Sequence, residues 1–121
     1  EMNRYAIGVD SDQAMVFADS DAEKAELVLT SMLKRVDNSL LRAVEMHING
    51  TLPYGEAEEL GLVEEAVGLA NNDFYQRNVS DELRAELAEL ADMIANGQIT
   101  VSSAMGMSTE ELNQLRDSVR P

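Results

Sequence analysis

Short apolar runs and amphipathic stretches alternate along most of this chain. The first run, residues 5–9, is rich in β-branched and apolar side chains and ends at the polar triplet 10–12. Its length and composition predict a buried strand that stops at a polar loop. Residues 13–22 have no clear period, and we expect a loop there.

The segment from residue 23 to residue 49 allows two interpretations. Period alone predicts one amphipathic helix from about Ala22 to Asn49, ended by Gly50. The second interpretation is a buried strand over residues 27–33, followed by a helix from about Arg35. Periodicity does not decide between them, because the apolar positions recur at spacings of three and four throughout: Leu29, Leu33, Val36, Leu40, Leu41, Val44 and Ile48.

Turn residues separate the elements of the second half. Pro53 and Gly55 predict a turn over residues 51–55. Two short apolar runs follow, residues 60–63 and 66–70, and they predict two short strands or one bent hairpin. Residues 71–73 are expected to be loop.

The remaining segments carry clear helix start signals. Ser80 is expected to cap a helix that runs to about Ala95. Ser108 and Glu111 form a capping box for a last helix through about Val119. Between the two helices, residues 99–101 read as a final short strand. The first of these helices has an apolar stripe of Leu83, Leu87, Leu90 and Ile94.

Strands that alternate with helices predict an α/β fold with parallel pairing and flanking helices. We divide the chain into residues 1–101, which carry this alternation, and a C-terminal tail, residues 102–121, with a short helix. A length of 121 residues suits one ordinary domain, and 45% hydrophobic residues allow a buried core.

Charge and composition exclude several classes of function for this chain. The formal net charge is −14, from 23 acidic and 9 basic residues, and such a surface repels nucleic acid and anionic lipid. The absence of cysteine excludes thiol catalysis and cysteine metal sites. His47 is the single histidine, so it cannot build a multi-histidine metal site, and no nucleophile and base are spaced as a triad. We therefore expect no enzyme, no metal and no cofactor.

Two motifs resemble a known family. Residues 7–13, Ile-Gly-Val-Asp-Ser-Asp-Gln, and residues 28–37, from Val28 to Asp37, are similar to the signatures of the basic-membrane-protein (BMP) family, the nucleoside-binding receptors of certain ABC importers. Residues 60–62, 67–70 and 94–101 are similar to further family segments. The resemblance implies the C-terminal part of a type I periplasmic-binding-protein fold, an incomplete parallel sheet flanked by helices, and it favours the strand over residues 27–33.

The resemblance also implies a ligand site in the cleft between two lobes. Asp10 and Asp12 lie where a strand ends in a loop, a position that suits ligand binding in open α/β sheets. By resemblance, an acidic residue here binds ribose and Lys34 is the lysine of the cleft. A carboxylate can accept bonds from two sugar hydroxyls, and an ammonium can donate to ribose oxygens. The structural alternatives are a loop carboxylate that caps the next segment and a surface lysine at a helix start.

The expected function is nucleoside capture, purine type, in an interlobe cleft, with delivery to the ABC permease subunits. The missing N-terminal lobe of the same protein would be a second partner. The implied location is extracytoplasmic, either periplasmic or anchored as a lipoprotein, with the anchor outside this chain. A second hypothesis is a small acidic interaction or regulatory domain without a small ligand, which would follow if residues 22–49 formed one helix.

An incomplete fold carries a structural consequence. The helix near residues 35–49 should rest on strands of the first lobe, so its apolar stripe would lack a partner here. We therefore expect the stripe to be exposed, or covered by another chain or by the helix after Ser108. Its members are Val36, Leu40, Leu41, Val44 and Ile48.

Overall fold

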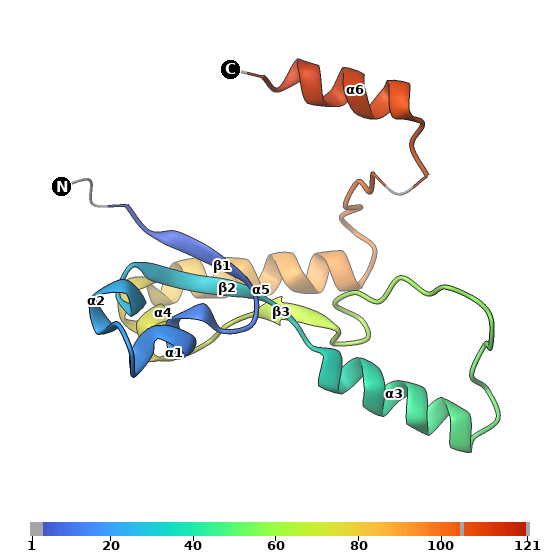
Figure 1. Cartoon of the computed structure of the whole chain (residues 1–121), viewed down its shortest axis with the longest axis horizontal. Coiled ribbons are helices and arrows are strands. Elements are labelled where there is room, and N and C mark those ends of the chain that lie inside the picture. Colours follow the sequence, from blue (N-terminus) through green and yellow to red (C-terminus); the bar gives the residue numbers. More distant parts are fainter. Residues whose placement is uncertain (1–3, 105, 121) are drawn as a thin grey trace.

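A small mixed sheet is the centre of the computed structural model, which describes residues 4–104 and 106–120. Strand β1 (Ala6–Asp10) pairs in parallel with β2 (Val28–Lys34), and β2 pairs antiparallel with β3 (Val67–Leu69), in the order β1-β2-β3 (Figure 1). The α/β class is confirmed. The prediction of purely parallel pairing is wrong for β3, which returns along β2 after a long loop instead of crossing over a face of the sheet.

Strand β2 and the helix after it settle the ambiguity of residues 23–49. Helix α3 spans Val36–Ile48, and Arg35 is its N-terminal flanking residue. The interpretation as a strand followed by a helix is thus confirmed, and the single long helix is wrong. β2 lies beside β1 over five paired positions, because its branched and small side chains fit between the neighbouring strand and the helices on the sheet.

Two short helices connect β1 to β2, where a loop was expected. Helix α1 spans Gln13–Ala18 and α2 spans Ala22–Ala25. Each begins after an aspartate, Asp12 or Asp21, whose side chain accepts a hydrogen bond from the backbone N–H three residues on. Helices this short contain too few turns to show a hydrophobic period, and their caps were the signal that we missed.

The chain before β3 is a turn, so the strand expected at residues 60–63 is wrong. The Gly61 amide donates to the side chain of Glu64 at 2.8 Å, and the Ala66 amide donates to the Gly61 carbonyl at 2.9 Å. These bonds close the loop just before β3 starts. The second expected run, residues 66–70, does contain β3.

The described residues contain three further helices: α4 (Asp73–Asn78), α5 (Asp81–Ala95) and α6 (Thr109–Ser118). The cap at Ser80 and the capping box at Ser108 are confirmed. Helix α4 lies largely where no element was expected.

The short strand expected at residues 99–101 is wrong. The Ile99 amide donates to the Met93 carbonyl in the last turn of α5, and residues 99–101 belong to none of the strands in the described part of the chain. The segment therefore leaves the end of α5 as an irregular chain that leads towards α6 (Figure 1).

The core is made mainly of small residues around β2. Ser31 is fully buried, and Thr30 is buried with its hydroxyl donating to the Ala70 carbonyl at 2.9 Å. Small side chains allow the helices that flank β2 to approach the strand closely. The buried apolar residues are Ala14, Ala25, Val28, Ala66, Ala70, Tyr75 and Val79.

Helix α3 projects away from the sheet and buries none of its residues (Figure 1). Its apolar stripe is exposed, as expected, with exposed fractions from 53% at Val36 to 76% at Ile48. Its polar side is bound to the loop that leads to β3. Arg42 donates two hydrogen bonds of 3.0 Å to Glu58, and the Asn38 side-chain amide donates to the Glu65 carbonyl at 2.9 Å.

Candidate ligand site at the ends of strands β1 and β2

The ends of the two parallel strands bring opposite charges together. Lys34 Nζ lies 2.9 Å from Asp10 Oδ1, although 24 positions separate the residues in the sequence. If the three residues form one site, Asp10, Asp12 and Lys34 should converge at one edge of the sheet, and this is confirmed for Asp10 and Lys34. Both side chains are nearly two-thirds exposed, so each can still reach a ligand. An ion pair this exposed contributes at most about 1 kcal/mol to stability, so folding alone gives little reason for it.

The backbone at Asp10 adopts an uncommon conformation. Its φ of 72° lies in the left-handed region, which aspartate tolerates better than most residues at some cost in energy. Strained backbone is concentrated at functional sites, although turns also use it, as at Glu65 with φ 52°. Here the left-handed residue turns the chain sharply at the end of β1 and holds its carboxylate at the sheet edge.

Asp12 has different surroundings from Asp10. Its two carboxylate oxygens each accept from Asn72 Nδ2 at 2.8 Å, and Oδ1 also accepts from the Met15 amide at 3.3 Å. Asp12 is half-buried, and these bonds cap α1 and connect it to the segment before α4. The structure therefore gives Asp12 the capping contacts of the structural alternative. Its contact with ligand stays a prediction.

Gln13 and Ser31 support the turn from beneath. The Gln13 side-chain amide donates to the Val9 carbonyl at 3.2 Å and to the Ser11 hydroxyl at 3.0 Å. The Gln13 backbone amide donates to the buried Ser31 hydroxyl at 3.0 Å. Sequence reasoning missed both residues, since the contact between Gln13 and Ser31 depends on how α1 folds back onto β2.

Gly8 is needed for this close approach. A Cβ atom at Gly8 would lie 2.4 Å from Ser31 Oγ and 2.6 Å from Gln13 Cγ, distances that real side chains do not reach. The glycine in the first motif therefore has a packing role: it lets the start of α1 lie directly against β1 and β2. The turn that carries Asp10 is thus held by tight contacts on its inner side.

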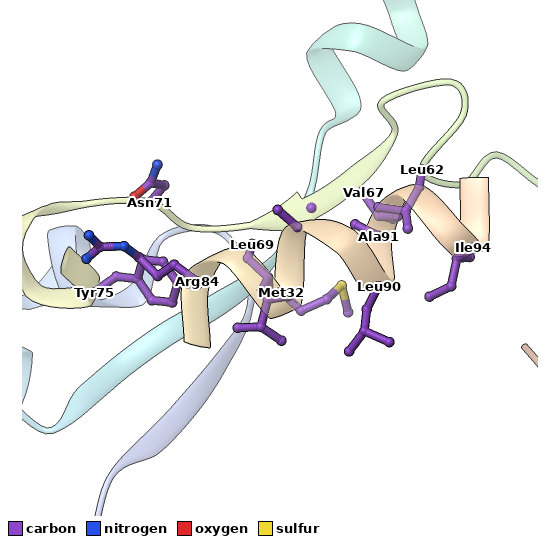
Figure 2. A pocket seen from close by; sticks show the side chains of 13 residues that line it. Met32, Leu62, Val67, Leu69, Asn71, Tyr75, Arg84, Leu90, Ala91 and Ile94 are labelled. Atoms are coloured by element: carbon purple, nitrogen blue, oxygen red, sulfur yellow. The ribbon is translucent and has the colours of Figure 1, made fainter. Parts of the chain in front are cut away.

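An apolar cavity of about 700 Å³ lies between the sheet and α5. Met32 of β2 and Leu69 of β3 line it from the sheet, and Leu90 and Ile94 line it from α5 (Figure 2). Three residues of the apolar stripe predicted for α5 line this cavity: Leu87, Leu90 and Ile94. Neither Asp10 nor Lys34 lines it, so it is separate from the charged pair. Its full lining is Met32, Leu62, Val67, Gly68, Leu69, Asn71, Tyr75, Arg84, Leu87, Ala88, Leu90, Ala91 and Ile94.

The charged pair and its chemistry suit reversible binding. Asp10 offers hydrogen-bond acceptors and Lys34 offers donors, which together match a molecule with neighbouring hydroxyl groups. In the described residues, His, Asp and Glu form no cluster of three or more that could hold a metal ion. His47 is exposed near the end of α3, where its ring bonds the Tyr54 hydroxyl, away from Asp10 and Lys34 in sequence and on a different element.

Comparison with known proteins identifies the family. Residues 1–103 match the family model Bmp, described as ABC transporter substrate-binding protein PnrA-like. The chain belongs to the Bmp family. The family is thus one of ABC transporter substrate-binding proteins, which supports a solute-binding role. The family resemblance drawn from residues 7–13 and 28–37 is confirmed.

Two curated relatives come from Listeria. A CD4+ T-cell-stimulating antigen of Listeria monocytogenes and one of Listeria innocua are each 35% identical to this chain over 100 residues. The matches cover 80% of this chain and 27% of each relative, so the chain spans about a quarter of the length of these proteins. Within the described residues, no helix is both long and apolar enough to cross a bilayer.

Proposed function

We propose that this chain is the C-terminal part of a longer extracytoplasmic receptor that binds a purine-type nucleoside between two lobes and delivers it to an ABC permease. Membership of the Bmp family supports a solute-binding role. The observation that carries the proposal is the exposed pair of Asp10 and Lys34 at the carboxyl ends of parallel strands. Ligands in open α/β folds bind at this edge.

In the proposed mechanism, Asp10 accepts hydrogen bonds from two neighbouring ribose hydroxyls and Lys34 donates to a ribose oxygen. The ion pair keeps Lys34 beside Asp10 before ligand arrives, so little reorganisation is needed on binding. Asp12, which caps α1, would contribute through any lone pair that Asn72 leaves free. Closure of the two lobes would then bury the ligand and strengthen each of these bonds.

The greater length of the Listeria relatives supports the proposal that another part of the receptor covers α3. Three-quarters of each Listeria relative lies outside the match, and the exposed stripe of α3 would be covered by the first lobe of the whole receptor. An apolar helix face left in water forfeits roughly 1.5–3 kcal/mol for each large side chain. A membrane anchor, carried as a lipid outside this chain, belongs to the same proposal.

The second hypothesis, an acidic interaction domain without a small ligand, depended on one helix across residues 22–49. The strand β2 removes that premise, and the chain's family is one of substrate-binding proteins. We therefore retain the receptor as the function that the geometry supports best.

A binding experiment tests the proposal. Isothermal titration of the full-length protein with adenosine, guanosine, inosine and uridine should show saturable binding, strongest for a purine nucleoside. The isolated 121-residue chain should show none, because it lacks the first lobe and any base stacking there, and stacking alone contributes about 1–3 kcal/mol per base. Tight binding by the isolated chain, or none by the full-length protein, would contradict the proposal.

A further inference from the structure

We infer that Gln13 is a positioning residue of the ligand site, acting on ligand affinity through Asp10. This inference rests on the proposed function and adds a residue to its site. Gln13 stands at the first position of α1, directly after the turn that carries Asp10. Its side chain points back to the turn, where its amide nitrogen donates to the Val9 carbonyl and to the Ser11 hydroxyl.

These two bonds hold the residues on both sides of Asp10. Val9 is the residue before Asp10 and Ser11 is the residue after it, so one amide group connects the Val9 backbone to the Ser11 side chain across the left-handed position. The Ser11 amide also donates to the Val9 carbonyl at 3.0 Å, which tightens the same turn. The left-handed backbone conformation of an aspartate is stable only where surrounding contacts hold it in place. The hydrogen bonds of Gln13 are among these contacts.

Gln13 itself is fixed in place by the sheet. Its backbone amide donates to the Ser31 hydroxyl, which is fully buried, and its Cβ and Cγ atoms lie over Gly8. The chain of contacts thus runs from the buried centre of β2, through Gln13, to the turn at Asp10. Lys34 approaches Asp10 from the far end of the same strand β2, so one strand positions both members of the charged pair.

Loss of the Gln13 amide should therefore weaken ligand binding without a direct ligand contact. In the full-length receptor, Gln13→Met keeps the length of the side chain and removes both donors. We expect the affinity for the best purine nucleoside to fall about tenfold, as the loss of one or two hydrogen bonds predicts. Gln13→Ala should give a similar loss. Gln76→Ala is the matched control, since its amide bonds Asn71 on an exposed surface, and its affinity should stay at the wild-type value.

A double-mutant cycle separates positioning from general damage. In an Asp10→Ala background, Gln13→Met should lower the affinity by less than about twofold, because the group that it positions is gone. An equal tenfold loss in both backgrounds would overturn the inference, and so would wild-type affinity in Gln13→Met. If the wild-type receptor binds no nucleoside, the proposed function fails first, which distinguishes the two failures. Thermal unfolding of each variant checks that the fold is intact.

Discussion

Strand β2 and helix α3 are consecutive in the sequence but differ in how far their residues are buried. β2 buries its first half against β1 and the short helices, down to the fully buried Ser31. α3 buries nothing, and its whole apolar stripe faces solvent. Monomeric proteins rarely expose contiguous apolar patches of this kind without a binding purpose. The sheet edge is thus structured within this chain, whereas the apolar stripe of α3 stays exposed in the described part of the chain. In the proposed receptor, the first lobe would cover this stripe.

Within the isolated chain, the largest expected effect comes from the packed residues around β2. Gly8→Ala should lower the free energy of unfolding by about 1–3 kcal/mol, as overpacking does, because the added Cβ would overlap Ser31 and Gln13. Gly61→Ala is the matched control. Its Cβ would meet nothing closer than Glu64 at 3.9 Å, and its backbone is not left-handed, so its unfolding curve should barely move. Urea denaturation measures both, and equal stability of the two variants would contradict the described packing.

Substitutions in the exposed apolar stripe of α3 should affect stability differently in the isolated chain and in the full-length receptor. In the isolated chain, Leu40→Gln with Val44→Gln should change stability by no more than about 0.5 kcal/mol per site, because both side chains are exposed. The same pair in the full-length receptor should cost several kcal/mol, at about 2 or more for each buried side chain lost.

Self-association gives a second measure of the α3 stripe. The double variant should associate less than the wild-type chain in sedimentation experiments, and Glu45→Gln on the same helix should not. Large destabilisation in the isolated chain would mean that the stripe is packed within this chain after all.

A smaller effect concerns the polar side of α3. The hydrogen bonds from Arg42 hold the pKa of Glu58 below its ordinary value of 4.5. Because the folded pKa is lowered, the pair stabilises the loop above the unfolded pKa, and this contribution is lost as the pH falls through the folded pKa. Hydrogen exchange of residues 56–66 should therefore accelerate on acidification, beyond the intrinsic change. Glu58→Gln should show the faster exchange already at neutral pH, and Glu56→Gln should resemble the wild type.

The sequence predicted those features that depend on a recognisable motif or on a local signal. Asp10 and Lys34 could be placed together because the family resemblance favoured a strand over residues 27–33, and parallel strands end at one edge of the sheet. The caps at Ser80 and Ser108 were equally clear, since a cap is a local signal. The ligand role of Asp10, Asp12 and Lys34, and the division at residue 101, stay predictions.

Features set by tertiary contacts could not be read from the sequence. The reversal of β3 depends on a turn closed by Glu64, and α1 and α4 are too short to show a period. The support of Asp10 by Gln13 requires that Gly8 and Ser31 meet beneath it, 23 positions apart in the chain. No pattern of hydrophobic and polar residues encodes such a contact.

In the proposed receptor, the pair of Asp10 and Lys34 serves ligand binding more than stability. Asp10→Asn and Lys34→Met in the full-length receptor should each weaken purine nucleoside binding by about tenfold to a hundredfold, as loss of charge-assisted hydrogen bonds predicts. Each should change the free energy of unfolding by less than about 1 kcal/mol, because the pair is exposed. The matched control is the ion pair of Arg77 and Glu26, also 2.9 Å long and exposed.

Calorimetric titration of these four variants is the most direct test: Asp10→Asn, Lys34→Met, Arg77→Met and Glu26→Gln. The account predicts weakened nucleoside binding in the first two and wild-type affinity in the last two, with all four folded. Wild-type affinity in both Asp10→Asn and Lys34→Met would contradict the account.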